Sequence, residues 1–203
     1  QGATLSTNCT ECAVNTFSKA TGSPSCNACL SGRTASVVGS VRCGVCPKGK
    51  KKSGDYEADG PESDNYTCVG CAAGYWSNSD ETECSRCPTG FYSNETESDS
   101  CQVCEAGRYN PNEASSKSMN VSCIKCMAGT YSSAKGVSNV DGCNECSPGR
   151  YSTEKGNTKS SKCQICVVGF FQGLSGNTTC HKCPSGFGNK AKGSTACNGV
   201  PPG

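Results

Sequence analysis

The residues with the clearest chemical potential in this chain are its cysteines, which make up 21 of 203 residues. All but one form Cys-x-x-Cys pairs, and the last, Cys197, stands alone. Thiols at this spacing can form disulfides, bind zinc or carry out thiol–disulfide exchange. The pairs begin at Cys9, Cys26, Cys43, Cys68, Cys84, Cys101, Cys123, Cys143, Cys163 and Cys180.

Zinc is the main alternative to disulfides, because two Cys-x-x-Cys pairs 13 residues apart match the spacing of structural zinc sites. Ten pairs in a row with a single histidine, His181, argue against zinc. A thioredoxin-like site needs its pair at a helix start within a βαβ pattern, which does not occur. Cysteine at this density is typical of disulfide scaffolds in oxidising compartments. We therefore expect disulfides, no metal or other protein cofactor, and an extracellular or cell-surface location.

Other chemistry finds little support in the sequence, and we do not expect an enzyme. No catalytic triad, repeated carboxylate pair or phosphate-binding loop is apparent, and His181 is expected to be an exposed loop residue. The cluster Lys48, Lys50, Lys51 and Lys52 could bind a polyanion. The acidic residues that follow, between Asp55 and Asp64, favour a solvated insertion instead.

The cysteine pairs belong to a repeat with a base period of about 17 residues. Three residues after the second cysteine of each pair comes glycine, with Asn15 as the one exception, which indicates a left-handed backbone at a turn. Gly-Ser or Gly-Asn forms a polar turn four residues before several of the closing cysteines. In seven modules an aromatic residue stands two residues beyond the turn glycine or Asn15, and we expect its ring to cover the disulfide of its own module or of a neighbour. These residues are Phe17, Trp76, Tyr92, Tyr109, Tyr131, Tyr151 and Phe171.

Two disulfide schemes respect this repeat, and sequence alone does not fix the connectivity. One joins the second cysteine of each pair to the first of the next: Cys12–Cys26, Cys29–Cys43, Cys46–Cys68, Cys71–Cys84, Cys87–Cys101, Cys104–Cys123, Cys126–Cys143, Cys146–Cys163, Cys166–Cys180 and Cys183–Cys197. The other interlaces consecutive pairs, as in Cys9–Cys26 with Cys12–Cys29, and leaves Cys197 over. The lead-in to Cys197 matches that of Cys26 and Cys180, which favours the first scheme. Cys9 is then left for an intermolecular bond, a free thiol or a partner upstream.

The segment Cys87-Pro88-Thr89-Gly90-Phe91-Tyr92-Ser93 resembles two related families. These are the ephrin-receptor-like cysteine repeat and the first half-module of tumour-necrosis-factor-receptor repeats, and the resemblance extends over residues 9–197. In that half-module the cysteine before Pro-x-Gly pairs with one about 14 residues further on, so the resemblance implies the first scheme. The interlaced second half-module is not evident, and ligand binding does not carry over. Long runs of such repeats are also similar to protist surface antigens and coat proteins.

Five N-glycosylation sequons add to the extracellular interpretation: Asn8, Asn65, Asn94, Asn120 and Asn177. Three of them, Asn65, Asn120 and Asn177, stand three residues before a closing cysteine, which suggests a designated exposed turn. We expect N-linked glycans at these sites. Asn8 is the weakest of them, because Cys9 follows it directly.

The composition predicts a fold held by disulfides more than by a hydrophobic core. Only 33% of the residues are apolar even with cysteine counted. A disulfide that closes a loop of about 15 residues contributes about 3 kcal/mol in the loop-entropy model. We expect a small, disulfide-rich, mostly β and irregular fold: about ten hairpin-like modules in a linear array, forming an extended rod. At about five residues per hairpin arm, the rod would measure on the order of 100 Å or more, whereas a globule of this length has a radius of gyration of about 17 Å.

The expected organisation is an N-terminal segment at 1–8, tandem repeats over 9–197 and a tail at 198–203. The modules open near residues 12, 29, 46, 71, 87, 104, 126, 146, 166 and 183. A net charge of +2 gives no reason to expect nucleic acid, and no apolar run is long enough for a membrane span.

The leading functional hypothesis is an extracellular structural glycoprotein, a repeat unit of a surface coat, stalk or fibril that assembles with copies of itself or other extracellular proteins. The alternative is a ligand-binding receptor ectodomain. Its binding site would lie in an irregular module, and the insertion between Cys46 and Cys68, with Tyr56 and Tyr66, is the best candidate.

Overall fold

The computed structural model of the chain describes residues 10–29, 33, 35, 37–44, 46–53, 67–78 and 83–199. Several residues singled out in the sequence lie outside these ranges: Cys9, Tyr56, Tyr66 and the sequon asparagines Asn8 and Asn65.

Ten disulfides divide the chain into modules 1 to 10, and their connectivity is that of the first scheme. In each module the opening cysteine is joined to the next cysteine along the chain, 13 to 22 residues away. The pairs in order are Cys12–Cys26, Cys29–Cys43, Cys46–Cys68, Cys71–Cys84, Cys87–Cys101, Cys104–Cys123, Cys126–Cys143, Cys146–Cys163, Cys166–Cys180 and Cys183–Cys197.

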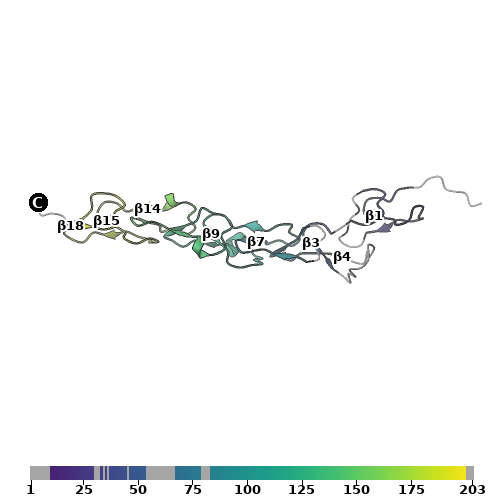
Figure 1. The fold of residues 1–203 in the computed structure, drawn as a ribbon, viewed down its shortest axis with the longest axis horizontal. Coiled ribbons are helices and arrows are strands. Elements are labelled where there is room, and N and C mark those ends of the chain that lie inside the picture. The colour runs from purple at the N-terminus through teal and green to yellow at the C-terminus, as the bar shows by residue number, and fades with distance from the viewer. Residues whose placement is uncertain are drawn as a thin grey trace, which may run out of the picture. The chain divides into compact units, whose positions relative to one another are not determined.

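The regular structure of the described residues consists mainly of two-stranded antiparallel hairpins (Figure 1). In each hairpin, an odd-numbered strand pairs with the next strand along the chain, as β1 does with β2. The strands are β1 (Thr16–Phe17), β2 (Asn27–Ala28), β3 (Lys50–Ser53), β4 (Thr67–Gly70), β5 (Tyr75–Trp76), β6 (Ser85–Arg86), β7 (Phe91–Tyr92), β8 (Gln102–Val103), β9 (Arg108–Tyr109), β10 (Ile124–Lys125), β11 (Thr130–Tyr131), β12 (Asn144–Glu145), β13 (Arg150–Tyr151), β14 (Gln164–Ile165), β15 (Phe170–Phe171), β16 (His181–Lys182), β17 (Phe187–Gly188) and β18 (Asn198–Gly199).

The hairpins share one construction, which explains the Cys-x-x-Cys repeat. The first strand begins directly after the turn glycine, and the second strand is the x-x of the following cysteine pair, so that Phe91 lies opposite Val103. The preceding turn is closed by the N–H of Phe91, which donates to the Pro88 carbonyl at 3.1 Å. Gly90 occupies its third residue with φ +83°, a conformation that favours glycine. Most strands have two residues, shorter than the expected five, because the disulfides restrict the length of each arm.

Modules 6 to 8, which are longer than the base repeat, accommodate their extra residues in single helical turns before the closing cysteine. These are the α-helix α1 (Met119–Ser122) and the 3-10 helices η1 (Val140–Gly142) and η2 (Ser160–Lys162). Asn139 caps η1, since its Oδ1 accepts the N–H of Asp141 at 3.1 Å. The insertions therefore leave the rest of the module unchanged.

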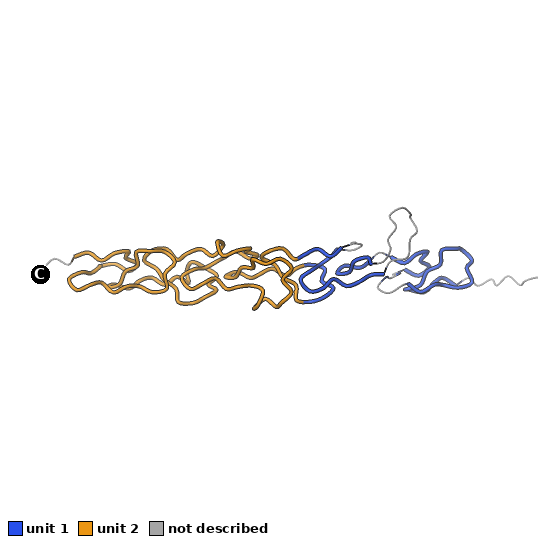
Figure 2. Tube along the Cα trace, turned by 90° about the horizontal axis from the view of Figure 1, so that it is seen from below, with its two compact units in different colours: residues 1–86, 95–100 blue, residues 87–94, 101–203 orange. Residues whose placement is uncertain are grey.

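The chain divides into two compact units (Figure 2). Unit 1 contains residues 1–86 and 95–100, and unit 2 contains residues 87–94 and 101–203. Within unit 2 the labelled strands β7, β9, β14, β15 and β18 follow one another in chain order (Figure 1).

The interior of the modules is built from disulfides. The opening cysteines of modules 3 to 9 are at most 1% exposed. The ring of Tyr92 packs with Cys104, Cys123 and Met119, so this aromatic residue covers the disulfide of the next module. The prediction of a small, disulfide-rich, mostly β fold made of a linear array of modules is confirmed. None of the helices among the described residues has the length and apolar character that crossing a membrane requires.

Candidate functional site

The geometry that recurs most regularly along the described part of the chain lies at the junctions between modules. Three positions of a module meet there wherever the structure describes them: the turn position, the inner position and the loop position, which are three, six and ten residues after the opening cysteine. In module 7, for example, they are Gly129, Ser132 and Gly136.

The inner position is polar and yet buried in most modules. Its side chains are between 0 and 2% exposed in modules 4 to 9, which hold Ser77, Ser93, Asn110, Ser132, Ser152 and Gln172 there. Buried polar groups need hydrogen-bond partners. Ser77 and Asn110 find theirs in the preceding module, whereas Ser152 and Gln172 donate to carbonyls of their own modules.

Three backbone hydrogen bonds recur at the junctions. In the first, the turn-position N–H of one module donates to the inner-position carbonyl of the next module. In the second, the loop-position N–H of that next module donates to the opening-cysteine carbonyl of the first module. The inner-position N–H donates to the carbonyl that follows the loop position of the next module. Between modules 7 and 8 these bonds are Gly129 to Ser152 (2.8 Å), Gly156 to Cys126 (2.8 Å) and Ser132 to Asn157 (2.9 Å).

The same set occurs between modules 1 and 2 of unit 1 and at each junction from module 5 to module 9 in unit 2. Between modules 9 and 10 the turn-position bond of Gly169 goes to the side-chain Oδ1 of Asn189 instead of a carbonyl. Because backbone atoms make these bonds, the stacking of the modules depends little on the identity of the exposed side chains.

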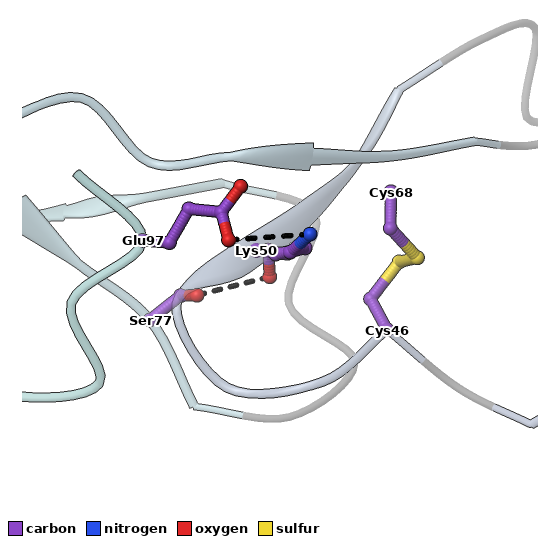
Figure 3. Close-up of polar contacts among 5 residues, drawn as sticks. All are labelled: Cys46, Lys50, Cys68, Ser77 and Glu97. Carbon is purple, nitrogen blue, oxygen red and sulfur yellow. Dashed lines mark hydrogen bonds and ion pairs between the residues drawn. A yellow bond between two sulfur atoms is a disulfide. The ribbon is translucent and has the colours of Figure 1, made fainter. Parts of the chain in front are cut away.

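Side chains at the inner position reach back to the preceding module. Ser77 Oγ donates to the Lys50 carbonyl at 2.9 Å (Figure 3). Asn110 Nδ2 donates to the Phe91 carbonyl at 2.8 Å, and Asn189 Nδ2 to the Phe170 carbonyl at 2.8 Å. Each of these carbonyls lies one residue after the turn position, so the contact is equivalent in the three modules.

Modules two apart also touch, through the turn glycine. A Cβ atom on Gly90 would collide with the carbonyl of Gly136, and one on Gly129 with the carbonyl of Gly176. In unit 1, the Lys50 ammonium lies 3.2 Å from the Glu97 carboxylate, an ion pair between modules 3 and 5 (Figure 3). At Gly90 and Gly129, glycine is therefore needed for close approach as well as for its backbone conformation.

Arginine side chains donate hydrogen bonds to a further set of carbonyls, a role that the sequence analysis did not predict. Arg33 Nη2, Arg108 Nη1 and Arg150 Nη1 donate to the carbonyl of the closing cysteine of their own module at 3.1, 2.8 and 3.0 Å. All three stand one residue after the turn position. That shared position is the one signal from which the role could have been predicted.

The structure places the described sequon asparagines in three different settings. Asn94 is exposed. Asn120 is exposed in α1, and its Oδ1 accepts from Arg108 Nη2 at 3.1 Å. Asn177 is half-buried, and its Nδ2 donates to the carbonyls of Leu174 and Ser175 at 3.2 and 3.1 Å. The shared spacing of Asn120 and Asn177 before a closing cysteine thus does not give them a shared environment.

The remaining residues of interest are dispersed. His181 is exposed, as expected, but lies in strand β16 opposite Phe171, with ring centroids 5.8 Å apart, rather than in a loop. Lys50, Lys51 and Lys52 form most of strand β3. Within the described ranges, no group of three or more His, Cys, Asp or Glu side chains is arranged to hold a metal ion.

These features define a class of protein: a tandem array of disulfide-linked hairpin modules that stack through backbone hydrogen bonds. Residues 74–119 and 156–198 match the family model described as tyrosine-protein kinase ephrin type A/B receptor-like. These two segments lie in modules 4 to 6 and 8 to 10, and they are similar to ephrin-receptor-like cysteine-rich repeats. No curated protein matches the chain. The disulfides and the family match together indicate an extracellular, disulfide-rich domain.

Proposed function

We propose that this chain is a non-catalytic structural glycoprotein of the extracellular space, a repeat unit of a surface coat, stalk or fibril. The observation that carries the proposal is the repetition of the same backbone hydrogen bonds at successive junctions. A stack held by backbone atoms and disulfides sets the spacing of its modules without relying on particular surface residues. The exposed sequon residues Asn94 and Asn120 suit glycosylation of such a surface.

The experiment that tests assembly is sedimentation velocity of the secreted, disulfide-intact chain over a wide range of concentration, with non-reducing electrophoresis of the same samples. A coat or fibril unit is expected to form larger species as concentration rises. Covalent assembly through Cys9 would also give reducible dimers or ladders, which a Cys9→Ser variant would lose. A monodisperse monomer at every concentration would contradict self-assembly.

A second candidate function is that of a receptor ectodomain, which the ephrin-receptor-like match favours. In that role the stacked modules would present a binding site instead of assembling. The monomeric outcome of the sedimentation experiment would favour this candidate, and deletion of the insertion between Cys46 and Cys68 should then abolish ligand binding.

A further inference from the structure

The near-neutral net charge of the chain conceals a strong segregation of charge along the sequence. Residues 67–146 contain ten acidic and five basic side chains, a net charge of −5. Residues 147–203 contain seven basic side chains and one acidic one, a net charge of +6. Modules 8 to 10 are therefore strongly basic, although the whole chain carries only +2.

The lysines of modules 8 to 10 are exposed, and they form no ion pair with any residue in the described part of the chain. By contrast, Lys50 and Lys135 are each paired with a glutamate. We call the six unpaired side chains the basic surface, and it consists of Lys155, Lys159, Lys162, Lys182, Lys190 and Lys192. Their positive charges are available to a partner.

The stacking geometry brings a further lysine to this surface. The side chain of Lys125 runs over Gly156, where an added Cβ would lie 3.3 Å from its Cγ and Cδ. Lys125 therefore lies beside the segment that contains Lys155, and both residues are exposed. Lys125 thus adds a further positive charge beside the basic surface, and a bound anion would neutralise it.

An apolar groove of about 330 Å³ lies within the same modules. It is lined by Tyr151, Ile165, Val167, Phe170 and Thr179, together with Cys180. Lys182 stands directly opposite Phe170 in the β15–β16 hairpin, so a positive charge borders the groove. Aromatic rings in a shallow groove can pack against the apolar face of a sugar ring, while lysines neutralise charges on the same ligand.

We infer that the basic surface of modules 8 to 10 binds a linear anionic polysaccharide, one that carries sulfate or carboxylate groups. The charges lie in module 8, in strand β16 and in module 10 rather than around one pocket, which fits an extended polyanion better than a single small anion. Flexible lysine side chains, rather than rigidly held arginines, suit a ligand with variable spacing of its charges. The inference concerns a partner and is independent of whether the chain assembles with itself.

The test uses heparin as the probe, with dextran sulfate as a second polyanion and neutral dextran as the uncharged comparison. The wild-type secreted chain is expected to be retained on immobilised heparin at physiological ionic strength and to be released by added salt. The variant Lys155→Gln/Lys159→Gln/Lys162→Gln should bind about ten times more weakly, since it removes three exposed ionic contacts. Its substitutions are all on exposed side chains, and circular dichroism with intact-mass analysis verifies that it folds with its disulfides formed.

The matched control is Arg42→Gln/Lys48→Gln/Lys51→Gln, which removes the same number of charges outside modules 8 to 10. This control should bind heparin like the wild type. The inference is overturned if the wild type is not retained, or if the two triple variants weaken equally, because net charge alone would then explain binding. It is also overturned if the chain binds phosphatidylserine vesicles but neither soluble polyanion, or if only the control loses affinity.

Discussion

At the scale of single residues, the inner position shows how polar side chains can fill a protein interior. Asn110 is fully buried and satisfies its amide through the Phe91 carbonyl and the Ser115 hydroxyl, both at 2.8 Å. Ser132 occupies the same position one module later and is equally buried, but its Oγ has no hydrogen-bond partner among the described residues. Two equivalent residues therefore contribute differently to their junctions.

Replacing Asn110 by alanine is expected to weaken its junction, whereas Ser132→Ala should have little effect or be slightly stabilising. A buried acceptor that loses its donor costs about 1–3 kcal/mol, and removing an unpartnered hydroxyl costs almost nothing. The amides of Gly90 and Gly107 report on the two junctions, because they donate to the carbonyls of Asn110 and Ser132. Hydrogen exchange of Gly90 should accelerate about ten- to a hundredfold in Asn110→Ala. Equal acceleration of Gly107 in Ser132→Ala would contradict this account.

At the scale of the structural element, the loop position uses a left-handed backbone to bond the preceding module. Most modules have glycine there, but Glu97 and Ala114 adopt φ values of +58° and +50°. A side chain in this conformation costs about 1–2 kcal/mol. The loop keeps its shape at these two positions because the N–H groups of Glu97 and Ala114 still donate to the carbonyls of Cys71 and Cys87 at 2.8 Å.

The substitution Ala114→Gly is expected to stabilise unit 2, and Gly156→Ala to destabilise it, each by about 1 kcal/mol or less. Gly156 has φ +76°, and an added methyl group there would meet only the flexible Lys125 side chain, so backbone conformation decides both effects. Guanidinium unfolding of the disulfide-intact protein, followed by near-ultraviolet circular dichroism of its tyrosines, measures the two midpoints. Midpoints that shift in the same direction would show that the loop conformation is not the controlling factor.

The sequence allowed the hairpins to be predicted, but not the way in which they stack. A glycine or asparagine at every turn position identifies the turn because few other residues adopt its backbone conformation. The serine of Gly-x-aromatic-Ser was visible as a repeat, as in Ser93 and Ser132, yet nothing in the pattern showed that it is buried. The junction bonds join backbone atoms of residues such as Gly129 and Ser152, and backbone atoms leave no signature in residue type. The basic surface was not predicted from the sequence because only the net charge of the whole chain was considered. That sum hides the excess of lysine in modules 8 to 10.

At the scale of the whole molecule, the disulfides differ in their protection from solvent. Cys26 of module 1 is exposed, whereas Cys104 and Cys123 of module 6 are both 0% exposed. A reductant reaches a disulfide only when a sulfur atom is accessible, so burial between neighbouring modules slows the reaction.

Limited reduction is therefore expected to open the Cys12–Cys26 bond early and the Cys104–Cys123 bond late. The measurement is brief treatment with a phosphine, alkylation of the freed thiols and peptide mapping by mass spectrometry. Simultaneous release of all ten bonds would mean that the modules open together and that stacking gives no local protection.

The pairing of each cysteine with the next one along the chain also determines how the protein would respond to a pulling force. The shortest covalent path from Cys12 to Cys197 crosses each disulfide and then the two residues of each Cys-x-x-Cys segment, bypassing the loops. Tension applied to the ends would travel along this path, so the oxidised chain can lengthen very little. Breaking one bond that closes a 14-residue separation would release about 40 Å of slack. Oxidation state thus sets whether the chain acts as a stiff tether or an extensible one, module by module.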